Sequence, residues 1–114
     1  MQPNPVAHKE LAAGRWFTFS PLEQLAHIGS EVDRAVRADA DGRRERRDRA
    51  IDRALELFDL TATDARWRGP RLRELRRARE EFCRLFFGDD VPAGSAESLR
   101  AYFLRFAMAV RRTA

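Results

Sequence analysis

The sequence predicts an all-α protein, an antiparallel up-down-up-down four-helix bundle that forms a single domain over residues 1–114. Three observations lead to this prediction. Apolar residues recur at the spacing of one helix face in four segments, Gly, Pro and Asp separate the segments, and no segment alternates as a strand would. Because 44% of the 114 residues are apolar, the chain can also bury a core of ordinary size.

The first helix is expected over about residues 21–38. The stretch "SPLE" at its start is typical of a capping box, in which Ser20 accepts from a first-turn N–H, Pro21 occupies the first helical position and Glu23 reaches back. Gly29 is small enough to let a neighbouring helix come close.

A lead-in over residues 1–19 precedes this helix and ends in an aromatic cluster of Trp16, Phe17 and Phe19. Two interpretations stay open for the cluster. It folds back over the open end of the bundle as an extended hydrophobic staple, or it is exposed and binds a partner. Trp67, which lies in the connection between the second and third helices, is a candidate to cap the same end.

The other three helices are expected over about residues 43–61, 71–87 and 96–112. Gly69 and Pro70 stop one helix and permit the next. Gly88 is expected in the left-handed conformation just past the third helix, and Ser95 is expected to cap the fourth.

Arginine supplies nearly all the positive charge, since Lys9 is the only lysine in a chain of net charge +4. Fourteen arginines against nine acids lie between residues 43 and 84, so this half of the chain is the basic half. By angle, Arg43, Arg44 and Arg47 continue the apolar stripe of the second helix. Unpaired guanidinium groups cannot be buried there, so these side chains are expected to project past the core or to meet acidic partners.

Further arginines lie on the outward faces of the second and third helices. A short connection makes these helices antiparallel neighbours, so the faces are expected to merge into one basic surface that binds phosphate backbones without reading bases. The predicted nucleic-acid-binding residues are Arg43, Arg44, Arg46, Arg47, Arg49, Arg53, Arg73, Arg77 and Arg84. Arg79 falls within an apolar stripe and needs a carboxylate or must reach the surface. A GC-rich coding sequence would produce the same arginine bias without any function.

Nothing in the sequence indicates catalysis, a cofactor or a bound metal. His8 and His27 are the only histidines, and neither sits in a cluster with metal-ligand spacing. There is no glycine-rich phosphate loop, and the single cysteine, Cys83, is expected at the edge of the core. Without a signal peptide or an apolar run of ~20 residues, the expectation is a cytoplasmic protein with no membrane contact.

Several segments resemble a bacterial four-helix-bundle family: "HKELAAGRWFTFSPLEQLAHIGSEVDRAV", "DRALELFDLT", "DARWRG" and "ESLRAYFLRFAMAVRR". This family contains the accessory variability determinant proteins of diversity-generating retroelements and the proteins encoded in intervening sequences of ribosomal RNA genes. The resemblance extends from His8 to Arg112. It implies a non-catalytic, homopentameric bundle with a basic surface that binds nucleic acid and associates with a reverse transcriptase.

Two functional hypotheses follow. The first is an oligomeric accessory protein that binds RNA or DNA and assists a retroelement reverse transcriptase. The second is a protein-interaction or scaffolding bundle with no nucleic-acid role, in which the aromatic lead-in and the arginine faces contact acidic proteins.

Overall fold

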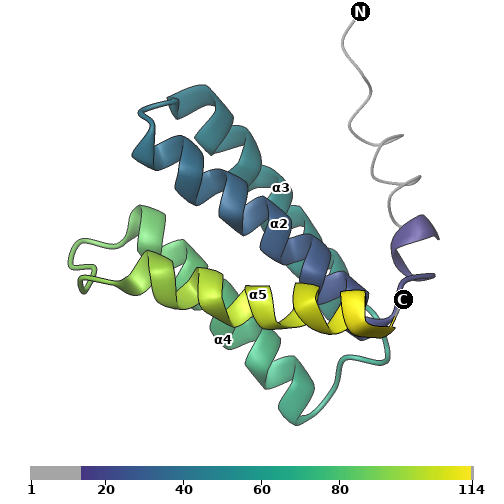
Figure 1. Ribbon diagram of the computed structural model, residues 1–114. Helices are drawn as coiled ribbons and strands as arrows, with labels where there is room; N and C mark the ends of the chain where they lie inside the picture. The colour runs from purple at the N-terminus through teal and green to yellow at the C-terminus, as the bar shows by residue number, and fades with distance from the viewer. Residues whose placement is uncertain (1–13, 114) are drawn as a thin grey trace, which may run out of the picture.

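The computed structural model describes residues 14–113, and they form an all-helical structure without strands, as the sequence predicts (Figure 1). A single helical turn at residues 14–16 precedes four long helices. These are α2 (Pro21–Ala40), α3 (Arg44–Ala62), α4 (Pro70–Phe87) and α5 (Ser95–Thr113). Each helix begins and ends within two residues of its expected boundaries.

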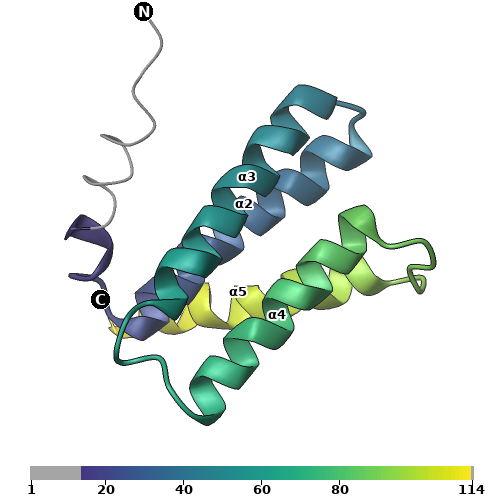
Figure 2. The same ribbon diagram turned by 180° about the vertical axis from the view of Figure 1, so that it is seen from behind.

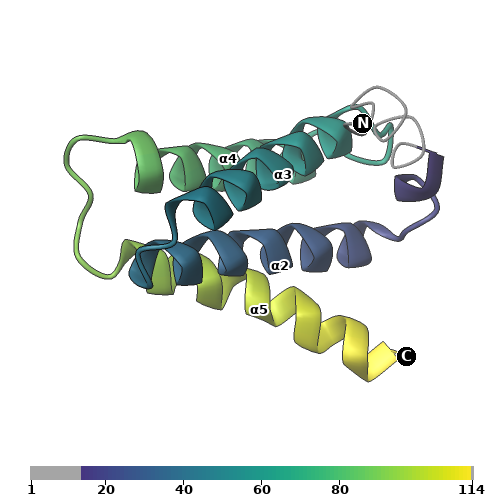
Figure 3. The same ribbon diagram turned by 90° about the horizontal axis from the view of Figure 1, so that it is seen from above.

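The helices are arranged as two pairs that cross at an angle. Helices α2 and α3 lie side by side in one pair and α4 and α5 form the other, as the front and back views show (Figures 1 and 2). The view from above places α2 between α3 and α5 (Figure 3). Helix α2 packs extensively against both of these helices, whereas α4 makes fewer contacts with α3 and α5.

The core lies where the two pairs cross. Ile28 and Val32 of α2 are fully buried, and so is Phe82 of α4. Phe58 of α3 joins the pairs, because its ring centroid lies 5.9 Å from that of Phe82 and 6.2 Å from that of Phe103. These rings belong to three different helices, so their contacts fix the crossing of the pairs.

The small residue at position 29 permits the close approach of α2 and α5. A Cβ atom added to Gly29 would lie only 2.6 Å from the Cβ of Phe103. The expectation that Gly29 admits a close neighbour is therefore confirmed, and the neighbour is α5.

Two predictions about helix ends were wrong. Gly88 is extended, with φ −82° and ψ 154°, and is not left-handed. Glycine is required there because an added Cβ would lie 2.5 Å from the carbonyl oxygen of Arg84. Ser95 is the first residue of α5, and its hydroxyl donates to the carbonyl of Pro92 at 2.6 Å instead of accepting from a helix N–H. Gly94, with φ +84°, makes the turn that precedes it.

Candidate nucleic-acid interface

A groove of about 620 Å³ runs between the second half of α2 and the first half of α3, near the turn that joins them. Six arginines, two alanines and a single aspartate line it. They are Arg34, Arg37, Ala38, Asp41, Arg43, Arg46, Arg49, Ala50 and Arg53. We call this feature the arginine groove. Its lining contains no aromatic ring and only one acid, so it presents mainly guanidinium groups to solvent.

Local sequence spacing explains how both walls form. On α3, Arg46, Arg49 and Arg53 recur at intervals of three and four residues, which keeps them on one face of the helix. On α2, Arg34 and Arg37 are likewise three residues apart. The turn between the helices is tight, with Gly42 at φ +71°, and it places the two arginine faces opposite each other.

Carboxylates of α2 hold three of the six guanidinium groups. Glu31 pairs with Arg34 at 2.9 Å through one oxygen and with Arg53 at 3.1 Å through the other, so it bridges α2 and α3. Asp33 pairs with Arg37 at 2.9 Å. These three guanidinium groups are partly neutralised and held in place.

The other three arginines of the groove, Arg43, Arg46 and Arg49, make no ion pair with any residue in the range 14–113. All three side chains are exposed. Arg43 occupies the N-cap position of α3, where no side chain accepts from the first-turn N–H groups. Positive charge therefore gathers at a helix end that is already electropositive, where an anion would be stabilised.

Arg44 and Arg47 do not line the groove. Arg44 is exposed, whereas the side chain of Arg47 retains only 30% exposure and pairs with Asp39 and Asp48, each at 3.1 Å. The hydrogen bond to Asp39, followed by that to Asp48, raises the pKa of Arg47. Arginines that continue the apolar stripe were predicted either to meet acids or to project outward. Arg47 meets two acids, and Arg44 projects outward.

The arginines of α4 lie elsewhere. Arg73 and Arg77 line a separate groove between α4 and α5, where Glu74 and Glu81 accompany them. Arg84, near the end of α4, is exposed and lines neither groove. The α3 and α4 faces do not merge into one lining, because α3 packs mainly against α2 and contacts α4 less.

Arg79, which lies on an apolar stripe, was predicted to need a carboxylate or to reach the surface, and it has a carboxylate partner. Its Nε donates to Asp59 Oδ1 of α3 at 2.9 Å. The side chain is half-buried, and the hydrogen bond to Asp59 raises its pKa. Arg79 thus joins α3 to α4 and is not available to a ligand in the way that Arg46 is.

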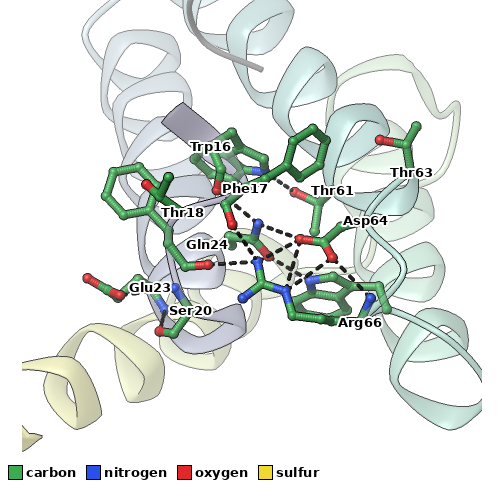
Figure 4. A network of polar contacts seen from close by, with 12 residues as sticks. Trp16, Phe17, Thr18, Ser20, Glu23, Gln24, Thr61, Thr63, Asp64 and Arg66 are labelled. Carbon is green, nitrogen blue, oxygen red and sulfur yellow. Dashed lines mark hydrogen bonds and ion pairs between the residues drawn. The ribbon is translucent and has the colours of Figure 1, made fainter. Parts of the chain in front are cut away.

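The opposite end of the α2–α3 pair holds a buried polar network (Figure 4). Gln24 is fully buried, and its Nε2 donates to the carbonyl of Trp16 and to Asp64 Oδ2, both at 3.1 Å. Its Oε1 accepts from the indole of Trp67 at 2.6 Å. The indole of Trp16 donates to Thr61 Oγ1 at 2.9 Å. Both tryptophans are buried, which confirms the structural interpretation for Trp16 and the capping position of Trp67.

Arg66 completes this network with its guanidinium group (Figure 4). It pairs with Asp64 at 2.7 Å and donates to the carbonyls of Phe19 at 2.7 Å and Phe17 at 3.3 Å. These bonds to Asp64 hold the pKa of its carboxyl well below the usual range. Phe17 remains 40% exposed, so only part of the aromatic cluster is buried in the core.

Sequence reasoning missed Arg34 and Arg37 as walls of the arginine groove. Their three-residue spacing already placed both arginines on one polar face of α2. That face could be assigned to the groove only after the structure showed α3 packed beside it. It also missed Gln24, although residue 24 continues the apolar stripe of Ile28 and Val32 by helical spacing.

No family model, no curated protein and no solved structure matches this chain. Within residues 14–113 no group of three or more His, Cys, Asp or Glu side chains is placed to hold a metal ion. None of the helices that the structure describes is long and apolar enough to cross a membrane.

Proposed function

We propose that this chain is a non-catalytic, cytoplasmic nucleic-acid-binding accessory protein that holds a phosphate backbone in the arginine groove. The observation that supports the proposal is the set of three exposed guanidinium groups, on Arg43, Arg46 and Arg49, that have no acidic partner among residues 14–113. Planar guanidinium groups bind phosphate oxygens through paired hydrogen bonds.

The chemistry of the groove favours backbone contacts over base recognition. Proteins that bind single strands stack bases on aromatic side chains, and no aromatic side chain lines this groove. Sequence readout needs side chains that reach base edges, whereas guanidinium groups in a row match successive phosphates. We therefore propose binding that depends on salt and is indifferent to sequence.

The wider role follows from the resemblance. We propose that the scaffold is an antiparallel up-down-up-down bundle, that copies of the chain assemble into a homo-oligomer, and that the protein assists a retroelement reverse transcriptase by binding its RNA or DNA. An adjacent reverse-transcriptase gene would support this role. Its absence would leave only the nucleic-acid-binding part of the proposal.

Exposed apolar side chains favour a second candidate function, a protein-interaction bundle. Phe87 is 66% exposed, and Leu104 and Met108 of α5 are about half exposed, at 54% and 49%. Exposed apolar clusters usually mark contact surfaces. In this function the arginine groove would bind acidic side chains of a protein and would not bind nucleic acid.

Binding measurements at several salt concentrations test the proposal. Labelled duplex DNA, duplex RNA and single strands of equal length are titrated with the protein, and poly-glutamate serves as a polyanion without phosphate. Three free arginines predict a log–log slope of about −3 for duplex DNA. A slope near zero, no binding at low salt, or equal competition by poly-glutamate contradicts the proposal and favours the protein-interaction function.

Two variants with the same change in charge locate the interface. The first carries Arg43→Gln, Arg46→Gln and Arg49→Gln and removes the unpaired groups of the groove. The second carries Arg73→Gln, Arg77→Gln and Arg84→Gln on α4. We expect the first to lose most of the affinity and salt dependence and the second to lose little. Equal losses would mean that net charge, and not the arginine groove, determines binding.

A further inference from the structure

The outer face of α5 carries a regular stripe of exposed residues. The intervals along it are four, three, four and three residues, which is the spacing that keeps side chains on one face toward a second helix. Two apolar side chains near its centre, Leu104 and Met108, are about half exposed. The stripe consists of Glu97, Ala101, Leu104, Met108 and Arg111, all of them exposed.

Opposite charges stand at the two ends of this stripe. Glu97 begins it and Arg111 ends it, and Leu104 lies seven residues from each. Neither Glu97 nor Arg111 forms an ion pair with any residue between 14 and 113. Because the charges have opposite sign and equal distance from the centre, the stripe is complementary to itself when a second copy is turned by a two-fold axis.

We propose that α5 of a second copy of this chain packs antiparallel on this stripe, with the two-fold axis at Leu104. Glu97 of each copy then reaches the partner's Arg111, so the dimer contains both ion pairs. Leu104 packs against the partner's Leu104, and Met108 lies opposite the partner's Ala101, which sets a large side chain against a small one. The contact is isologous, since both copies use the same residues.

The surroundings of the stripe leave room for a second helix. A groove of about 600 Å³ runs between α2 and α5, and four of the five stripe residues line its α5 wall. Small residues, Ala26, Gly29 and Ser30, line one part of its α2 wall, and Asp33 and Arg37 line the rest. Asp33 is already paired within the chain, with Arg37 at 2.9 Å and with Arg100 at 2.7 Å. Arg105 flanks the stripe, but its guanidinium carbon lies 5.5 Å from the ring centroid of Tyr102, over the ring. It is therefore held by the protein's own aromatic surface.

Charge complementarity is the reason for assigning the stripe to a second copy and not to an unrelated partner. The apolar part contains only three residues per copy, so the contact is small and the dimer is expected to be weak and dependent on concentration. A two-fold contact also differs from a ring, because a pentamer requires head-to-tail contacts between different surfaces. The mass in solution therefore distinguishes this dimer from the pentamer that the family resemblance implies.

Light scattering and sedimentation over a range of protein concentrations measure the association, without nucleic acid and with a reductant that keeps Cys83 from forming disulfides. We expect a monomer–dimer equilibrium for the native sequence. A monomer at every concentration, or a pentamer, overturns the proposal. Since no nucleic acid is present, this outcome is independent of the proposed binding to nucleic acid, which the salt titrations test separately. A monomer at every concentration would contradict both this dimer and the proposed homo-oligomer, whereas a pentamer would contradict the dimer alone.

Charge reversals identify the contact. Glu97→Arg alone and Arg111→Glu alone each set like charges against each other at both ends, so each variant is expected to be monomeric. An equimolar mixture of the two variants restores both attractive pairs and is expected to form a heterodimer. A matched reversal on α4, Glu80→Arg, is expected to leave the dimer intact. Circular dichroism confirms that each variant is folded, and failure of the mixture to associate overturns the proposed geometry.

Discussion

Arginine has opposite surroundings at the two ends of the α2–α3 pair. At the end near Trp16, the guanidinium of Arg66 pairs with Asp64 at 2.7 Å and donates to two backbone carbonyls. At the end near the α2–α3 turn, Arg46 and Arg49 extend from α3 into the arginine groove with no acidic partner among residues 14–113. The same residue type serves the fold at one end and is left available at the other.

The difference shows that local composition does not decide the role of a charged residue, whereas the surrounding packing does. No side-chain nitrogen or oxygen buried within residues 14–113 lacks a hydrogen-bond partner. Arg66 is bound to a carboxylate that is itself fixed by Gln24. Arg46 lies on an exposed helix face with acids nearby in sequence, but it forms no ion pair with any residue from 14 to 113. We therefore expect substitutions near Arg66 to change stability most and substitutions in the arginine groove to change it least.

Removing an indole from the network end should have the largest effect. Trp67→Ala deletes a buried side chain, opens a cavity and leaves the carbonyl oxygen of Gln24 without its donor. We expect a loss of about 3–5 kcal/mol in the free energy of unfolding. Urea denaturation followed by circular dichroism measures it. Arg68→Ala, at an exposed neighbouring position, serves as the control and should change stability by less than about 0.5 kcal/mol.

Acid should weaken the same end. The bond from Arg66 holds the pKa of Asp64 well below its usual value, so the carboxylate stabilises the folded state above pH ~4 and this contribution is lost as the pH falls toward the folded-state pKa. Asp64→Asn should cost about 1–3 kcal/mol near neutral pH. The difference between native and variant should shrink in acid. A constant difference from pH 7 to pH 2 would contradict this assignment.

Changes at the turn end should hardly affect stability. Replacing Arg43, Arg46 and Arg49 by Gln removes positive charge from the start of α3. Each positive charge there interacts unfavourably with the helix dipole and costs a few tenths of a kcal/mol of stability. We expect the free energy of unfolding to stay within about 1 kcal/mol of the native value. Thermal denaturation measures this change. A large loss would show that these arginines support the fold and would remove the contrast between the two ends.

Much of the fold could be predicted because its signals are local. The capping box at Ser20 forms as expected, with Glu23 N donating to Ser20 Oγ at 3.1 Å and Ser20 N donating to Glu23 Oε1 at 3.0 Å. Gly69 takes φ +61° just before α4, where Pro70 starts the helix. Such signals depend on neighbours within a few residues, so they can be read from the chain alone.

The candidate site could be predicted only in part, because it depends on which helices pack together. The face of Arg46 and Arg49 was predicted from helical angles, but its partner wall on α2 was not. Adjacency in sequence favoured α4 as the neighbour of that face, whereas the packing of α3 against α2 decided otherwise. The predicted left-handed conformation of Gly88 was wrong for a related reason. Glycine is needed there because a side chain would collide with the carbonyl of Arg84 one turn earlier, and not because φ is positive.

The side-chain amide of Gln24 has a fixed polarity that neither of its close analogues can reproduce. Its nitrogen faces two acceptors and its oxygen faces one donor. Glutamate would turn an oxygen toward the carboxylate of Asp64, and methionine would fill the space but satisfy none of the three groups. One NH₂ group in the interior thus dictates a unique amino acid at this position and holds the backbone of Trp16 against α2.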